Sequence, residues 1–178
     1  DQLFLEIKNI SGDYVGKEQK QIDEFYLTGG NANLPGLMVY FSEKKIKWSD
    51  VLEAIDSALQ APFAGNINNL KFIIIEDKEK KNKIAEYAQQ NWLANASIIV
   101  IVCADPSQLE RMYSDRAEMY ERQHAGAAIQ NFLLKITELG LASCWVGAFT
   151  EEYIKKELRI PKDIRVEAIL PVGYPPKP

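Results

Sequence analysis

The feature that most constrains this 178-residue chain is the β-branched run 97–103, which begins with Ser97 and is otherwise apolar, built mainly from Ile and Val. Branching at Cβ restricts side-chain rotation and favours an extended backbone, so the run predicts a strand. Polar and apolar residues do not alternate along it, which indicates that neither face of the strand meets water. The chain must therefore place covering elements on both sides of a sheet, as layered domains do.

Three further segments favour strands, and helical patterns lie between them. Besides 97–103, the expected strands are 71–76, 142–146 and 166–172. The expected helices are 50–61, 77–90, one that begins at 105, 124–139, and one that follows Thr150. Asp50 and Glu53 form a capping-box pattern at the first helix, and Thr150 is the expected cap of the last. This order predicts an α+β fold, in the sense of a layered α/β domain.

The first 34 residues carry weaker patterns than the rest of the chain. A Gly- and Asn-rich segment, 28–36, interrupts regular structure because Gly and Asn tolerate positive φ and Pro35 ends an element. We therefore expect residues 1–34 to form an N-terminal arm and residues 35–178 to form the main domain. A domain of this size buries enough surface to fold without disulfides or a structural metal.

Charge and cysteine content exclude several classes of function. A net charge of -4 and a pI near 5.2 argue against nucleic acid as a partner, since phosphate binding needs a basic face. The two cysteines, Cys103 and Cys144, lie in apolar runs, where a free thiol behaves as a small hydrophobe. This usage is typical of a reducing compartment, so we expect a cytoplasmic protein without a secretory signal. No apolar stretch approaches the roughly 18 residues of a membrane span.

A single histidine, His124, narrows the possible chemistry further. One histidine provides neither a two-His zinc pair nor, without a GxSxG turn, a hydrolase triad. The cysteines are not arranged as CxxC, and the chain has no P-loop and no GxGxxG pattern. We expect His124 to be a solvated or capping group at the start of a helix. The chemistry must therefore come largely from a cofactor, and we expect no metal site.

Three segments, in order, carry a resemblance to a known family. They are 61–72 (APFAGNINNLKF), 126–134 with 139–149 (GAAIQNFLL and LGLASCWVGAF), and 170–175 (LPVGYP). In this order and spacing they resemble the nitroreductase family. The resemblance implies a homodimer that holds FMN between its subunits. It also implies a central, mostly antiparallel sheet flanked by helices.

The resemblance also implies which residues contact the flavin. Reduction places negative charge at N5 and at the N1/O2 edge of the ring, where rigid main-chain N–H groups are suitable donors. The implied contacts come from the loop between the helix and the strand of the first segment, from an amide pair, and from the strand end, with the Gly147 N–H directed at N5. They are Pro62, Phe63, Ala64, Asn66, Asn68, Gln90, Asn91, Trp145, Val146, Gly147 and Ala148. The 62–68 loop would reach the flavin of the partner subunit.

One part of the family pattern is missing. Relatives open with an RRSxRxF stretch whose cations bind the FMN phosphate, but alignment on Phe41 leaves Pro35, Gly36, Leu37 and Val39 at those positions. Each lost charge-assisted hydrogen bond would cost roughly 1.5–3 kcal/mol. Three replacements for the missing phosphate-binding cations remain open. They are a lysine among Lys44, Lys45 and Lys47, a group from the 1–34 arm, and a C-terminal tail.

The expected function is an FMN-dependent oxidoreductase. As the resemblance implies, NADH or NADPH would reduce the flavin, and a nitroaromatic, quinone or enone would then accept two electrons in the same pocket. No side chain is assigned as a catalytic acid or base. One alternative is a flavin-binding or flavin-less member of the fold that acts as a sensor or partner protein. Another is a specialised flavin enzyme such as a dehalogenase, an azoline oxidase or a flavin-fragmenting enzyme.

Overall fold

The computed structural model describes residues 45–175. The expected arm, 1–34, and the expected domain boundary at residue 35 lie outside this part of the chain, as do the positions aligned with the phosphate-binding stretch. The arm, the domain boundary and the missing phosphate ligands therefore stay predictions.

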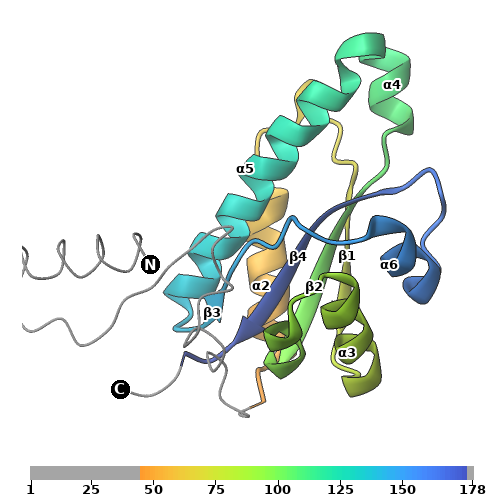
Figure 1. Ribbon diagram of the computed structural model, residues 1–178. Coiled ribbons are helices and arrows are strands. Elements are labelled where there is room, and N and C mark those ends of the chain that lie inside the picture. The colour runs from red at the N-terminus through yellow and green to blue at the C-terminus, as the bar shows by residue number, and fades with distance from the viewer. Residues whose placement is uncertain (1–44, 176–178) are drawn as a thin grey trace, which may run out of the picture.

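The centre of the fold is a four-stranded antiparallel sheet in the order β1-β2-β4-β3 (Figure 1). The strands are β1 (Leu70–Ile75), β2 (Ile98–Ala104), β3 (Ala142–Ser143) and β4 (Arg165–Gly173). β2 is the apolar run and lies between β1 and β4, so its main chain is paired on both edges. The expected α+β class and the antiparallel sheet are confirmed.

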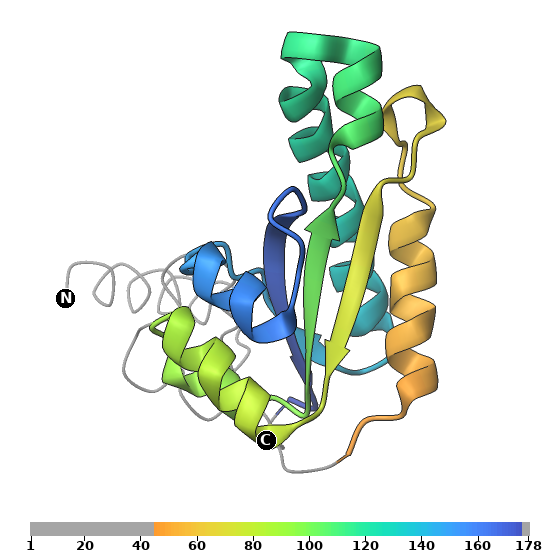
Figure 2. The same ribbon diagram turned by 90° about the vertical axis from the view of Figure 1, so that its right-hand side faces the viewer.

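Helices cover both faces of this sheet (Figure 2). On one face lie α2 (Trp48–Leu59) and the long α5 (Ala117–Glu138). On the other face lie α3 (Lys78–Tyr87), the 3₁₀ turn η2 (Asn91–Asn95) and α6 (Glu151–Leu158). The short helix α4 (Ser107–Tyr113) and two 3₁₀ turns, η1 (Ala64–Asn66) and η3 (Ser114–Arg116), complete the fold.

The two faces of β2 supply two separate hydrophobic cores. Ile98, Val100 and Val102 belong to the core under α2 and α5, whereas Ile99 and Ile101 belong to the core under α3 and α6. Every residue of β2 is buried. Complete burial of one such side chain stabilises the fold by about 1.5–3 kcal/mol. The absence of alternation therefore correctly indicated a strand covered on both sides.

Two of the expected caps are wrong. α2 begins at Trp48 with Lys47 as the preceding residue, and Asp50 lies inside its first turn, where its N–H bonds to the Lys47 carbonyl oxygen at 3.1 Å. The Asp50 carboxylate therefore interacts favourably with the positive end of the helix dipole, but it does not cap the helix. Thr150 precedes α6 as expected, yet its side chain makes no capping hydrogen bond. α3 is the helix with a side-chain cap, since the Asp77 carboxylate accepts from the Lys80 N–H at 2.9 Å.

The boundaries of two elements near the candidate site also differ from expectation. α5 begins at Ala117 rather than at 124, so His124 lies in the body of the helix and not at its start. The expected strand 142–146 pairs regularly only at β3, and Val146 then forms an isolated bridge with Ile169. The intervening Cys144 and Trp145 are outside the ladder. Both corrections affect residues that face the candidate site.

Candidate functional site

The segment that follows β3 leaves its main chain open to ligands. The Val146 N–H and carbonyl both bond to Ile169 of β4, each at 3.0 Å, and fix the segment at one point. Val146 is buried, whereas Gly147 and Ala148 on its C-terminal side are exposed. Among residues 45–175, no acceptor is found for the N–H of Gly147 or Ala148. These amides are thus donors without a partner in the described part of the chain.

Gly147 also leaves space where any other residue would have a side chain. A Cβ built at this position would lie 3.9 Å from the Trp145 indole nitrogen and would meet no nearer atom. Trp145 itself is 40% exposed, and its ring extends to Gly126 of α5, where a built Cβ would lie 3.6 Å from the indole carbon Cη2. An exposed indole beside unpaired amides is a suitable surface for a planar, electron-accepting ring. The residues of this segment thus fit the flavin that the sequence suggested.

The η1 turn is built differently, because side chains hold it from two sides. Gly65 and Asn66 have φ of 59° and 58°, so the turn needs a residue without a Cβ at its centre. A Cβ on Gly65 would lie 2.8 Å from the Tyr113 hydroxyl and 3.0 Å from the Met112 sulfur, both in α4. Phe63, just before the turn, packs edge-to-face on the His124 ring with centroids 5.1 Å apart.

The other loop residues suggested by the family pattern have distinct environments. Pro62 and Asn66 are exposed, and Ala64 is half-buried with its N–H bonded to His124 Nδ1 at 3.3 Å. The Asn66 side chain has no hydrogen-bond partner within 45–175, so it is free to contact a ligand. The Asn68 side-chain oxygen accepts from the Leu70 N–H at 3.3 Å and is already engaged at the start of β1.

A buried polar network that no sequence pattern indicated lies behind η1. His124 is 3% exposed, not solvated as expected, and its Nε2 lies 2.8 Å from the side-chain oxygen of Asn69. The Asn69 amide nitrogen donates to Glu121 Oε2 at 2.8 Å and to the Asp105 carbonyl at 3.0 Å. Glu121 Oε1 in turn accepts from Arg165 at 3.0 Å. A helix register that placed 121 and 124 on one face would have revealed part of this network.

Burial sets the protonation behaviour of this network. It lowers the pKa of the His124 imidazole, which favours the neutral ring. It raises the pKa of the Glu121 carboxyl, and the positive charge of Arg165 opposes that effect. Burial also raises the pKa of the Cys103 thiol to about 12 and that of Cys144 to about 11. Both cysteines are therefore unreactive thiols at neutral pH.

The amide pair Gln90 and Asn91 lies on the opposite side of the sheet from η1. Gln90 follows α3 and donates its N–H to the Ala85 carbonyl at 2.9 Å, while Asn91 begins η2 and is exposed. The Thr150 N–H donates to the Tyr87 carbonyl at 2.9 Å. This bond joins the end of α3 to the segment that follows Gly147.

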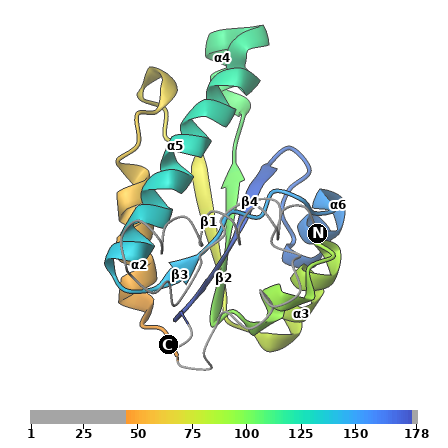
Figure 3. The same ribbon diagram turned by 60° about the vertical axis from the view of Figure 1, so that its left-hand side comes forward.

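Within one chain, α5 separates η1 from the Gly147 segment (Figure 3). His124 of α5 bonds to η1, whereas Gly126 of the same helix lies under the Trp145 ring. Residues two positions apart on a helix point about 200° apart around its axis. The two groups of predicted flavin contacts therefore lie on different faces of one helix.

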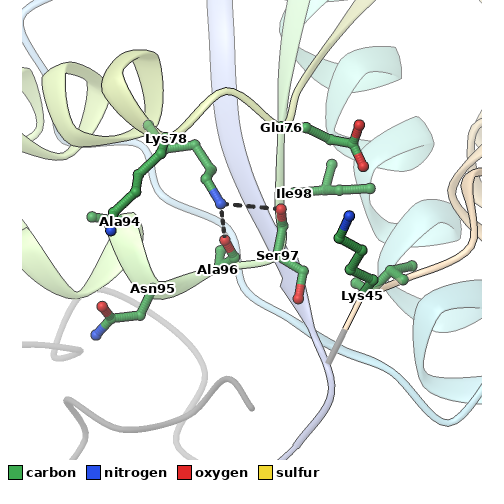
Figure 4. A pocket seen from close by; sticks show the side chains of 10 residues that line it. Lys45, Glu76, Lys78, Ala94, Asn95, Ala96, Ser97 and Ile98 are labelled. Atoms are coloured by element: carbon green, nitrogen blue, oxygen red, sulfur yellow. Dashed lines mark hydrogen bonds between the residues drawn. The ribbon is translucent and has the colours of Figure 1, made fainter. Parts of the chain in front are cut away.

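A cavity whose lining includes three lysines lies elsewhere. It has a volume of about 660 Å³ and includes Lys45, Glu76, Lys78 and Lys81 in its lining (Figure 4). The Lys81 ammonium donates to the Ala96 carbonyl at 2.7 Å and to the Ser97 carbonyl at 3.1 Å, and burial lowers its pKa. The Lys81 ammonium thus already binds main-chain carbonyls of the protein. The residues that line this cavity are not those of the Gly147 segment.

Other proposed replacements for the phosphate-binding cations are only partly described. Lys45 lines that cavity, and Lys47 directly precedes α2, at the end of the helix remote from η1 (Figure 1). Lys44 and positions 35–41 lie outside the described residues. In the described part of the chain, no His, Cys, Asp and Glu side chains cluster as metal ligands.

A helix that spans a membrane must be both long and apolar. None of the helices within 45–175 is both long and apolar enough to cross a bilayer.

Comparisons with known proteins agree on one family. The model of the Nitroreductase family matches residues 40–96 and 86–174. A protein from Archaeoglobus fulgidus named an NADH dehydrogenase/NAD(P)H nitroreductase is 34% identical over 140 residues, which cover 76% of this chain and 78% of the relative. An iodotyrosine deiodinase from Thermotoga neapolitana is 26% identical, with 78% and 84% covered.

Solved structures show the same fold. A nitroreductase family protein from Clostridium novyi is similar with a TM-score of 0.70 and 28% identity, over 78% of this chain and 79% of that one. An NADPH:FMN oxidoreductase from Vibrio harveyi has a TM-score of 0.69 and 20% identity, over 77% and 64%. The match of sequence, of a curated relative and of architecture establishes that this chain belongs to the nitroreductase family.

Proposed function

We propose that this protein is an FMN-dependent oxidoreductase that moves two electrons from NADH or NADPH to an electron-poor small molecule. The observation that carries the proposal is the exposed main chain at Gly147, whose N–H has no partner among residues 45–175 and which has no side chain of its own. FMN, when bound, would supply the redox chemistry itself. The names of similar proteins, an FMN reductase from Bacillus subtilis among them, support this cofactor.

The chain's own groups have three tasks in this proposal. The N–H groups at Gly147 and Ala148 would donate to the edge of the ring that becomes electron-rich, and fixed amides do so without titrating. Trp145 and Val146 would form the wall behind the ring. Gln90 and Asn91 would contact its pyrimidine edge with amide groups. No side chain is assigned to proton transfer.

The remaining contacts would come from a second copy of the chain. Pro62, Phe63, Ala64, Asn66 and Asn68 lie on the other side of α5 from Gly147, so a complete site needs two chains arranged symmetrically.

Exposed apolar side chains on the outer face of α2 and α5 support such a homodimer. Leu134 of α5 is 60% exposed, and Trp48 and Leu52 of α2 are also exposed. Apolar side chains that gather on one outer layer are typical of an interface.

Leu134→Glu tests the dimer directly. The variant should sediment as a monomer and lose FMN, because it places a charge in the proposed interface. Tyr153→Glu is the matched control, since Tyr153 of α6 is similarly exposed, at 56%, but lies on the opposite face of the sheet. Equal sedimentation of both variants and of the wild type would contradict the proposed interface.

The visible spectrum of the purified protein tests the cofactor and the activity. We expect a yellow protein whose colour is bleached by NADH or NADPH without oxygen and returns when a nitroaromatic, quinone or enone is added. Comparing acceptors also tests whether this chain prefers an iodinated phenol, the substrate class suggested by the name of the Thermotoga neapolitana relative. A yellow protein that neither nucleotide reduces would contradict the proposed activity.

A second candidate function follows from the missing phosphate ligands. Pro35, Gly36, Leu37 and Val39 cannot neutralise a phosphate dianion. This sequence favours a member of the fold that binds flavin without turnover, or has lost it, and acts as a sensor or partner protein. A colourless protein that takes up no FMN at micromolar concentration would support this candidate over the first.

A further inference from the structure

The turn η1 is fixed by a hydrogen bond from its own main chain to a buried histidine. The Ala64 N–H donates to His124 Nδ1 at 3.3 Å, across 60 positions of sequence. The other hydrogen bonds of the turn are internal, since the Asn66 and Ile67 N–H groups bond to the carbonyls of Phe63 and Ala64. His124 is therefore the side chain that joins η1 to α5.

The hydrogen-bond network determines which nitrogen of His124 carries the proton. Asn69 directs one end of its amide at two acceptors, Glu121 Oε2 and the Asp105 carbonyl, so that end must be the NH₂ group. The other end, which faces His124 Nε2 at 2.8 Å, must then be the oxygen. Since this oxygen can only accept, Nε2 carries the hydrogen. Nδ1 is consequently unprotonated and accepts from Ala64.

A second contact holds the same turn from the side of α4. Gly65 lies so close to the Tyr113 hydroxyl and the Met112 sulfur that no side chain fits there. Phe63 packs on the His124 ring from the residue before the turn. Contacts with α4 and α5 thus hold the turn from two sides. The hydrogen bond from Ala64 to His124 sets the position of the turn along α5.

We propose that His124, held in one neutral tautomer by Asn69 and Glu121, is a positioning residue that places the η1 turn for flavin binding. The role of η1 rests on the proposed function, since Ala64 and Asn66 are among the predicted flavin contacts. His124 itself does not touch the cofactor. It acts through the main chain of Ala64.

Protonation of His124 would reverse the contact with η1. Nδ1 would become a donor facing the Ala64 N–H, so the turn would lose its anchor. The charged and titratable groups around the ring are Glu121 on α5, reached through Asn69, Arg165 of β4 behind Glu121, and Tyr113 of α4 against the turn. The Asp105 carboxylate accepts from the Ser107 N–H and is turned to α4. Flavin affinity should therefore fall as the pH drops through the range in which His124 is protonated.

Three substitutions of His124 separate the two ring nitrogens. His124→Asn keeps an acceptor near the position of Nδ1 and loses the contact with Asn69. His124→Gln keeps a donor near the position of Nε2 and loses the acceptor for Ala64. His124→Leu loses both. Ile136→Val is the control, because Ile136 is a fully buried residue of the same helix that lies outside the network.

The experiment measures FMN affinity by fluorescence titration, together with hydrogen exchange at the Ala64 amide in the absence of FMN. We expect His124→Leu and His124→Gln to weaken FMN binding about tenfold and to accelerate Ala64 exchange, while His124→Asn stays within about threefold of the wild type. Ile136→Val should reduce thermal stability without changing either quantity. Because His124 is the sole histidine, ¹⁵N NMR of labelled histidine should show a protonated Nε2 and an unprotonated Nδ1.

The outcomes distinguish this inference from the proposed function. If the wild type binds no FMN, the proposed function fails, and the NMR tautomer and Ala64 exchange alone decide whether His124 positions the turn. If the wild type binds FMN but all three variants bind it equally well, the positioning role is wrong although the protein remains a flavoprotein. A protonated Nδ1, or unchanged Ala64 exchange in the Leu variant, would overturn the inference in either case.

Discussion

The η1 turn and the Gly147 segment contrast in how they are held. Side chains fix η1, because His124 accepts from Ala64 and α4 presses on Gly65. The hydrogen bonds that hold the Gly147 segment come from the main chain, through the bridge between Val146 and Ile169. The main-chain N–H groups of Ala64 and Asn66 in η1 are therefore paired inside the protein, whereas those of Gly147 and Ala148 have no partner among the described residues. The difference teaches that the two halves of a candidate site can depend on quite different parts of the sequence.

The largest effect is expected where the main chain itself is the functional group. Gly147→Pro removes the proposed donor to the ring and should lower the rate of flavin reduction by about 10²–10³-fold, the usual consequence of losing one such donor. The fold should persist, because this N–H has no partner among the described residues. Rapid-mixing kinetics with NADH and circular dichroism provide the two measurements. An unchanged rate would show that the ring binds elsewhere.

Gly147→Ala sharpens the same prediction, since it keeps the N–H and adds only a methyl group. The isolated chain has room for that Cβ, so thermal stability should not change. A large loss of FMN affinity with an unchanged melting temperature would mean that the ring lies against this residue.

The next largest effect is expected in the network behind η1. Asn69→Leu leaves Glu121 and His124 with unpaired buried groups and should destabilise the fold by about 2–4 kcal/mol. Asn68→Ala, one position away and exposed, removes a single bond to the Leu70 N–H and should cost about 1 kcal/mol or less. Urea unfolding of both variants measures the two losses in the free energy of unfolding. Similar losses would mean that the network contributes no more than a surface turn.

A comparison of Gly65→Ala with Gly140→Ala separates the cost of backbone strain at η1 from the cost of packing there. Gly65 and Gly140 both have positive φ, 59° and 70°, so alanine costs each about 1–2 kcal/mol. At Gly65 the added Cβ also collides with α4, at a further cost of about 1–3 kcal/mol, whereas Gly140 has no atom within 4 Å. Gly65→Ala should therefore be the more destabilising by denaturant titration. Equal effects would show that α4 does not press on the turn.

The smallest effect is a pH dependence of stability. Burial lowers the pKa of His124 in the folded state below the ordinary value of 6.5, so the unfolded chain binds this proton more tightly. The stabilising contribution is complete above pH 6.5 and is lost as the pH falls from there through the folded-state pKa. Free energies of unfolding of the wild type and of His124→Leu should therefore converge towards acid pH. A difference that is constant between pH 8 and 5 would contradict this.

Much of the fold could be predicted because its signals are local. The unbroken apolar run of β2 indicated a two-sided sheet, and the order of strands and helices indicated the layered class. The three family-like segments, read from type and spacing, led to the family to which the chain belongs. The start of α5 was missed because Glu121 and His124 take buried positions that apolar residues usually occupy, so the helical pattern is interrupted.

By itself, the sequence determined the covered sheet and the family, since the signals for both lie in runs of neighbouring residues. Only the tertiary structure decided that His124 is buried and bonded to Ala64, and that Asn69 joins it to Glu121. These partners are 52 to 60 positions apart in the chain, and no local pattern specifies such pairs. They meet because η1, the start of β1 and the middle of α5 converge when the helix packs on the sheet, and a buried polar group must then find its partner there.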